Sequence, residues 1–188
     1  AVGVEAMEST YKLAKENLEK FKYKKYVELH NCLSTKFETE EKFDVCVSEI
    51  IGCIGGSEGA EVSINDAKKR LLKEGAKIVP YSCQTYVAGV CLEELVDNIQ
   101  FHPSAVGYIN NIFLHNGSPF DLRLALTHPP KNHNLFHTDE MLVEDLQFET
   151  GNSKTDFERF IKINKNCKID GLLLWIDLVV DNYSRSIN

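Results

Sequence analysis

The chain has 188 residues, of which 43% are hydrophobic and 26% charged, and this composition excludes collagen-like, coiled-coil and disordered classes. Its 21 basic and 28 acidic residues give a net charge of −7 without a strongly basic stripe, so we expect no nucleic-acid partner. The longest apolar runs, such as residues 171–180, are shorter than the roughly 20 residues that span a bilayer. With no cleavable signal visible, we expect a cytoplasmic protein that has no membrane partner.

The first 80 residues alternate between strand-like and helix-like patterns. Apolar runs predict strands over residues 1–5, 26–29, 43–47 and 76–79. Apolar residues at helical spacing predict helices over residues 8–22 and 60–72, the second stopping at Lys73-Glu74-Gly75. Helices placed between apolar strands indicate an α/β fold with a mostly parallel sheet covered on both faces.

The pattern changes after Pro80, where strand-like runs begin to dominate. We expect strands over residues 84–92, 157–163 and 171–180, helices over 92–99 and 104–113, and loops from about 116 to 155. Residues 81–188 are therefore predicted to be largely antiparallel β and barrel-like. This gives two parts, residues 1–80 and residues 81–188.

Cysteine and histidine usage gives no strong metal signature. No pair of the six cysteines has close metal-ligand spacing, and most lie in or beside apolar strand-like runs, so we expect reduced thiols. His128, His133 and His137 gather in a loop-like stretch that could hold a metal ion. A solvated loop explains them more simply, and we predict no metal site.

Two acids stand where an open α/β sheet binds ligands, outside the carboxyl ends of its strands, and a third lies in the loop behind one of them. Glu5 closes the first predicted strand, a position from which a carboxylate commonly takes ribose hydroxyls. Glu49 follows the strand over residues 43–47 and opens a glycine-rich stretch, and Glu58 comes nine residues later. Two carboxylates on one tight loop can converge on one cationic or hydroxyl-bearing group. Alternatively, Glu58 is only a helix N-terminal acid favoured by the helix dipole.

Three segments together resemble the S-adenosylmethionine-dependent protein arginine methyltransferase family. They are Val4-Glu5-Ala6, Val45-Cys-Val-Ser-Glu-Ile-Ile-Gly52 with Glu58, and Lys73-Glu-Gly-Ala-Lys-Ile-Val-Pro80, in matching order over about residues 1–92. Gly171-Leu-Leu-Leu-Trp-Ile-Asp177 is a weaker match to a barrel strand of that family. The resemblance implies a Rossmann-like cofactor-binding domain, incomplete at its N-terminus, followed by a β-barrel substrate domain.

The resemblance also implies roles for particular residues. Glu5 and Ala6 would contact the ribose of S-adenosylmethionine, and Leu33 and Ser34 would lie along its adenine. Glu49 and Glu58 would face the methyl acceptor as the catalytic pair, with Glu49 also next to the cofactor. For a guanidinium they would clamp the cation and aim one nitrogen lone pair at the methyl carbon.

The chain also departs from the family pattern. The family's glycine-rich first motif should precede Ala1, and its Thr-His-Trp loop should follow the strand over 171–180, so we expect a fragment. The small loop Gly52-Cys-Ile-Gly-Gly-Ser57 leaves the acceptor open between a small-molecule hydroxyl, slightly favoured, and a protein arginine.

An inactive binding or scaffold domain is the alternative to an enzyme. A dehydrogenase does not fit, because the glycines lack the Gly-x-Gly-x-x-Gly spacing. A homodimer through an arm at residues 110–121 or 131–140 is a further expectation from the resemblance.

Overall fold

The computed structural model describes residues 1–95, 102–117, 135–156 and 158–181. The chain divides into two compact units. The first consists of Ala1–Tyr86, Leu142–Glu158 and Leu174–Asn188, and the second of Val87–Met141 and Arg159–Leu173. The predicted boundary at Pro80 stays a prediction.

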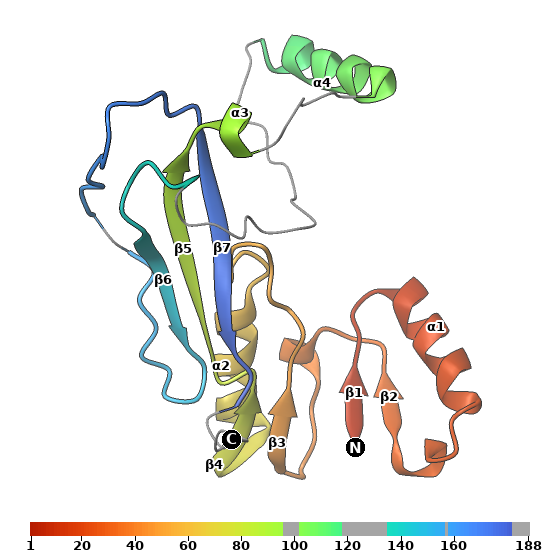
Figure 1. Cartoon of the computed structure of the whole chain (residues 1–188). Coiled ribbons are helices and arrows are strands. Elements are labelled where there is room, and N and C mark those ends of the chain that lie inside the picture. Colours follow the sequence, from red (N-terminus) through yellow and green to blue (C-terminus); the bar gives the residue numbers. More distant parts are fainter. Residues whose placement is uncertain (96–101, 118–134, 157, 182–188) are drawn as a thin grey trace. The chain divides into compact units, whose positions relative to one another are not determined.

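The N-terminal part of the first unit contains two parallel strand pairs, each linked by a helix (Figure 1). Strands β1 (Val2–Val4) and β2 (Glu28–His30) flank α1 (Glu8–Glu19) in the sequence. Strands β3 (Phe43–Val47) and β4 (Leu72–Val79) likewise flank α2 (Ala60–Arg70). Parallel neighbours need such a crossover, so the predicted alternation of strand and helix is confirmed. The pairs form separate two-stranded sheets, and the single sheet is not confirmed.

Strand β4 begins earlier than expected, and its start replaces the predicted end of a helix. Helix α2 ends at Arg70 with Leu71 as its C-cap, so the helix stop predicted at residues 73–75 is wrong. Gly75 lies inside β4 with φ +73°, where the register jumps from Phe43 opposite Leu72 to Val45 opposite Lys77. Glycine adopts this left-handed conformation without a Cβ clash, which lets the extra residues bulge from the strand.

A three-stranded sheet in the order β6-β5-β7 follows, with β5 (Ser82–Val90) in the middle (Figure 1). The Tyr81 N–H donates to the Val179 carbonyl at 2.8 Å, and the Asp170 N–H donates to the Val90 carbonyl at 3.2 Å. The beginning of β5 therefore meets the end of β7 (Gly171–Val179), so these two strands are antiparallel, as expected.

Two of the second-half predictions are wrong. Strand β6 (Met141–Gln147) lies in a stretch expected to be loop. No strand spans residues 158–163, where only Ile163 forms a single bridge, to Thr138. A mixed α/β fold is confirmed, but the strands of the described residues form no closed barrel.

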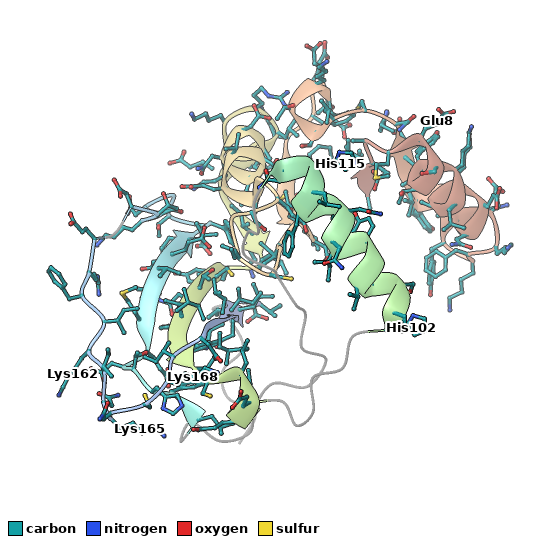
Figure 2. All side chains as sticks on the ribbon, turned by 90° about the horizontal axis from the view of Figure 1, so that it is seen from above. Glu8, His102, His115, Lys162, Lys165 and Lys168 are labelled. Atoms are coloured by element: carbon teal, nitrogen blue, oxygen red, sulfur yellow. The ribbon has the colours of Figure 1, made fainter. Side chains whose placement is uncertain are left out.

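Two 3₁₀ turns and two further helices complete the described residues. They are 3₁₀ turns at η1 (Lys24–Tyr26) and η2 (Ser34–Lys36), a single turn at α3 (Leu92–Leu95), and α4 (Pro103–Asn116). The ring of His102 accepts a hydrogen bond from the Ser104 N–H at the start of α4, and His115 lies near its end (Figure 2). The helix predicted over residues 104–113 is thus confirmed. None of the described helices is long and apolar enough to cross a membrane.

Parts of some predictions lie outside the described residues. The helix expected over residues 92–99 is seen only as α3. The proposed arm at residues 110–121 coincides with α4 up to Asn116, and residues 118–134 are not described.

The main hydrophobic core lies in the first unit and joins α2 to both kinds of sheet. Its fully buried members come from α2, β4, β5 and β6 and the residue after β6: Ala60, Ile64, Leu72, Ile78, Cys83, Leu146 and Phe148. Ile50 and Ile51, which follow β3, pack against the same cluster. A smaller cluster of Phe37, Ala67 and Leu71 contacts Val2 and Val4 of β1. Helix α2 therefore contributes to both clusters.

Replacing Ile64 by alanine should lower the free energy of unfolding by about 2–5 kcal/mol, since it removes buried methyl groups and leaves a cavity. Ile64 is only 2% exposed. Val62→Ala on the same helix is the matched control, because Val62 is 70% exposed, and a change within about 0.5 kcal/mol is expected. Urea denaturation of both variants measures the difference, and equal losses would contradict the assigned core.

Candidate active site

The acid loop, residues 48–59, connects the carboxyl end of β3 to the beginning of α2. The Ser48 N–H donates to the Val79 carbonyl at 2.8 Å, so the pairing of β3 with β4 continues one residue past the strand. Glu49 follows directly, with an exposed side chain. The last hydrogen bond between β3 and β4 therefore fixes the backbone position of the residue directly before Glu49.

The second half of the acid loop folds back on its first half. A Cβ added to Gly52 would clash with the Ser57 Oγ and lie 3.3 Å from the Glu58 Cγ. The Ser57 N–H also donates to the Ile54 carbonyl at 2.9 Å. Glycine at position 52 permits this close approach without any shift of the Ser57 side chain. The loop brings the stem of Glu58 beside Gly52, and the meeting of the two carboxylates stays a prediction.

The position of Glu58 relative to α2 bears on its simpler interpretation. Gly59, with φ +78°, is the N-cap of α2, so Glu58 stands one residue before the N-cap and is exposed. The acid in the first turn is Glu61. Glu58 is therefore not a first-turn acid.

Two polar side chains from the antiparallel sheet hold the tip of the acid loop. The Gly55 N–H donates to the Thr85 Oγ1 at 3.0 Å, and the Gly56 N–H donates to the Glu144 Oε2 at 3.3 Å. The Thr85 hydroxyl in turn donates to the same Glu144 oxygen at 2.6 Å. Sequence reasoning missed both residues, since Glu144 falls in a predicted loop and Thr85 reads as an ordinary strand residue.

A buried thiol lies under the same loop tip. Cys83 is fully buried, and a Cβ on Gly55 would lie 2.6 Å from its Sγ. Burial raises the pKa of the Cys83 thiol to about 11, with further contributions from the nearby negative charges of Glu144 and Asp177. Cys83 is therefore a protonated packing residue, whereas Cys53 on the acid loop is exposed.

Glu5 stands at the end of β1, as predicted, and its carboxylate turns toward the chain that follows. The Met7 N–H, at the N-cap of α1, donates to the Glu5 Oε1 at 2.6 Å. The Asn31 side-chain amide donates to the carbonyls of Glu5 and Ala6 at 2.8 and 3.3 Å. Asn31 thus fastens the segment after β2 to the end of β1, which brings the two predicted cofactor segments together.

Leu33 and Ser34 lie in that second segment, at the start of η2. Leu33 is half exposed, and the Arg70 Nη2 donates to the Ser34 carbonyl at 2.9 Å. Arg70 also donates to the Phe37 carbonyl at 2.7 Å. The last residue of α2 therefore holds both ends of η2, a role that the sequence pattern did not reveal.

Arg70 is itself oriented by Asp66 one turn earlier on α2. The Arg70 Nε donates to the Asp66 Oδ1 at 2.8 Å, and this hydrogen bond lowers the pKa of the Asp66 carboxyl. A lowered pKa stabilises the fold above the pKa of the unfolded chain, and this stabilisation is lost as the pH falls through the folded value. The hydrogen bonds from Arg70 to η2 should therefore weaken only at acidic pH, where Asp66 becomes protonated.

The histidine cluster is only partly described. His128 and His133 lie outside the described residues, whereas His137 is fully buried in the second unit, where its Nε2 lies 3.2 Å from the Glu94 Oε2. Neither ring nitrogen of His137 has an aligned hydrogen-bond partner. The contact between His137 and Glu94 is therefore an ion pair only when His137 is protonated. Within the described part of the chain, no three metal-ligating side chains gather.

Comparison with solved structures identifies the fold. Trypanosoma brucei PRMT1, in its enzyme-prozyme heterotetrameric complex with AdoHcy, matches 78% of this chain with 15% identity and a TM-score of 0.54. Arabidopsis thaliana protein arginine methyltransferase 10 matches 78% of this chain with 15% identity and a TM-score of 0.53. No family model and no curated protein matches the chain.

These likenesses place the chain in the fold of protein arginine methyltransferases. The matches cover only 45% and 47% of the two solved chains, so this chain spans less than half of their length.

The two thiols near the loop tip should differ in reactivity. At pH 8, iodoacetamide should modify Cys53 in the folded protein and leave Cys83 unmodified, since the thiolate is the reactive form and Cys83 stays protonated below about pH 11. Peptide mass spectrometry measures both sites, and in denaturant both should react. Equal labelling of the folded protein would contradict the burial of Cys83.

Proposed function

We propose that the chain acts as an S-adenosylmethionine-dependent methyltransferase, with residues 1–80 as a Rossmann-like cofactor-binding part and residues 81–188 as the substrate part. The observation that carries the proposal is the acid loop, in which Glu49 and Glu58 flank a turn held by Thr85 and Glu144. The arginine methyltransferase fold supports the same conclusion. The proposed setting is cytoplasmic, with homodimers as the expected assembly.

The residues around Glu5 fit one end of the cofactor. A carboxylate has two acceptor oxygens, and the Met7 N–H uses one of them, so the second can accept a ribose hydroxyl. Ala6, Leu33 and Ser34 would lie along the nucleoside, with η2 held by Arg70. When bound, S-adenosylmethionine supplies a methyl group on a positively charged sulfur that an acceptor lone pair can take.

Glu49 and Glu58 would bind and orient the methyl acceptor. Two carboxylates can hold a guanidinium through charge-assisted hydrogen bonds and leave one nitrogen aimed at the methyl carbon. Glu49 and Glu58 are both acids of the acid loop, and two carboxylates complement a cationic guanidinium, so we favour a protein arginine over the small-molecule hydroxyl.

An inactive binding domain of the same fold is the second candidate. A likeness at 15% identity shows the fold and not the catalytic activity. Calorimetric titration with S-adenosylmethionine, followed by mass spectrometry of an arginine peptide and a hydroxyl-bearing small molecule, tests the proposal. Cofactor binding without methyl transfer to either acceptor would favour the inactive binding domain. If S-adenosylmethionine does not bind, its proposed role as cofactor is wrong.

Glu5→Ala should weaken S-adenosylmethionine binding by about 1–3 kcal/mol, the loss expected for hydrogen bonds to a charged group. Calorimetry measures the dissociation constant. Glu8→Ala is the matched control, because Glu8 pairs with Lys12 on α1 and is exposed. The proposed ribose contact is wrong if the two variants bind the cofactor equally well.

Glu49→Gln and Glu58→Gln should each lower kcat by about two orders of magnitude or more with little change in cofactor affinity, since each removes an interaction with the acceptor. Radiolabelled methyl transfer measures kcat, and calorimetry measures affinity. Glu61→Gln, in the first turn of α2, is the control. A fully active Glu58→Gln protein would remove Glu58 from the catalytic pair.

A further inference from the structure

We propose that Thr85 and Glu144 are positioning residues that fix the acid loop, so that Glu49 and Glu58 are presented to the acceptor as a rigid pair. The inference rests on the proposed methyltransferase function for its catalytic consequence. The contacts that define the pair do not depend on that function.

Thr85 connects the sheet to the loop through a single hydroxyl. Its side chain is fully buried, and the hydroxyl accepts from the Gly55 N–H while donating to the Glu144 Oε2. A hydroxyl can both accept and donate, which a carboxylate or an amine cannot do in this arrangement. Because a buried polar group without a partner is costly, the threonine and the loop amide hold each other in place.

Glu144 occupies a place on β6 where an apolar residue is expected. Alternate residues of a strand share a face, so Glu144 points to the same side as Leu146, which is fully buried. A carboxylate there needs hydrogen-bond donors, and it receives two, from the Thr85 hydroxyl and the Gly56 N–H. These donors come from β5 and from the acid loop, and their convergence explains an acid at this register.

The two glycines make this approach possible. A Cβ on Gly56 would lie 2.8 Å from the Glu144 Oε1, and one on Gly55 would lie 2.6 Å from the Cys83 Sγ. A Cβ at either position would require the contacting side chain or the loop to shift. The loop tip is therefore shaped to receive the pair, and its distance from Glu58 is only two residues along the chain.

The test compares Thr85→Val, which keeps the shape and removes the hydroxyl, with Thr85→Ser, which restores the hydroxyl. Glu144→Met removes both acceptor oxygens at a similar side-chain length, and it serves as a second variant if Thr85→Val fails to fold. Asp145→Asn is the matched control, because Asp145 neighbours Glu144 on β6 but accepts from Gln84 and Gln147 instead of the loop.

Two readouts are measured on the full chain. Hydrogen exchange at the Gly55 and Gly56 amides reports the order of the loop without any cofactor or substrate. Steady-state kinetics report kcat and KM for the acceptor, and calorimetry reports cofactor affinity. Thr85→Val should lose exchange protection at both amides and lower kcat by roughly 10- to 100-fold with cofactor affinity unchanged. Thr85→Ser should restore both, and Asp145→Asn should match the parent.

The outcomes separate this inference from the proposed function. Retained protection in Thr85→Val and Glu144→Met overturns the positioning pair, and so does lost protection with unchanged kcat in an active protein. If the parent chain transfers no methyl group, the proposed function fails, and the exchange data alone decide whether the pair holds the loop.

Discussion

The acid loop depends on the hydrophobic cluster around Ile64 and Phe148, because both of its ends are anchored there. Ile50 and Ile51 pack against the cluster at the beginning of the loop, and Ala60, fully buried, belongs to it at the end. The same cluster takes Cys83 from β5 and Leu146 from β6, so one core holds the loop and the strands that contact its tip. Since protein interiors are close-packed, a shift of the helix in this core would move the loop.

The sequence was most informative where neighbouring residues decide the structure. The run over residues 43–47 predicted β3 with its observed bounds, and the spacing around residues 104–113 predicted α4. Glu5 and Glu49 were singled out because each stands close behind a strand that the local pattern reveals, and Glu58 because it follows Glu49 by nine residues in a glycine-rich stretch. Strand β6 was missed because Glu144 interrupts the apolar face that Leu146 continues. The residue that breaks the strand pattern is thus the one that contacts the acid loop.

Contacts between distant residues could not be predicted from a single sequence. Gly55 and Thr85 are 30 residues apart, and Gly56 and Glu144 are 88 apart. Arg70 reaches back 36 residues to the carbonyl of Ser34. Threonine, arginine and glutamate are common on surfaces, and only the fold shows that these three hold loops in place. Gly75 was predicted to end a helix, whereas it forms a bulge in β4. A glycine with positive φ occurs both after helix ends and in β-bulges, so the sequence alone did not distinguish the two.

The stack between Tyr86 and Trp175 gives the chain an optical consequence. Trp175 is the only tryptophan of the sequence, and its ring lies 5.7 Å from that of Tyr86 with an interplanar angle of 14°. Tyr86 follows Thr85 on β5 in the sequence, and Trp175 belongs to β7. The emission of this one indole therefore reports the pairing of β5 with β7 without an added label. A change in its wavelength on adding a ligand would locate a rearrangement in the sheet that carries Thr85.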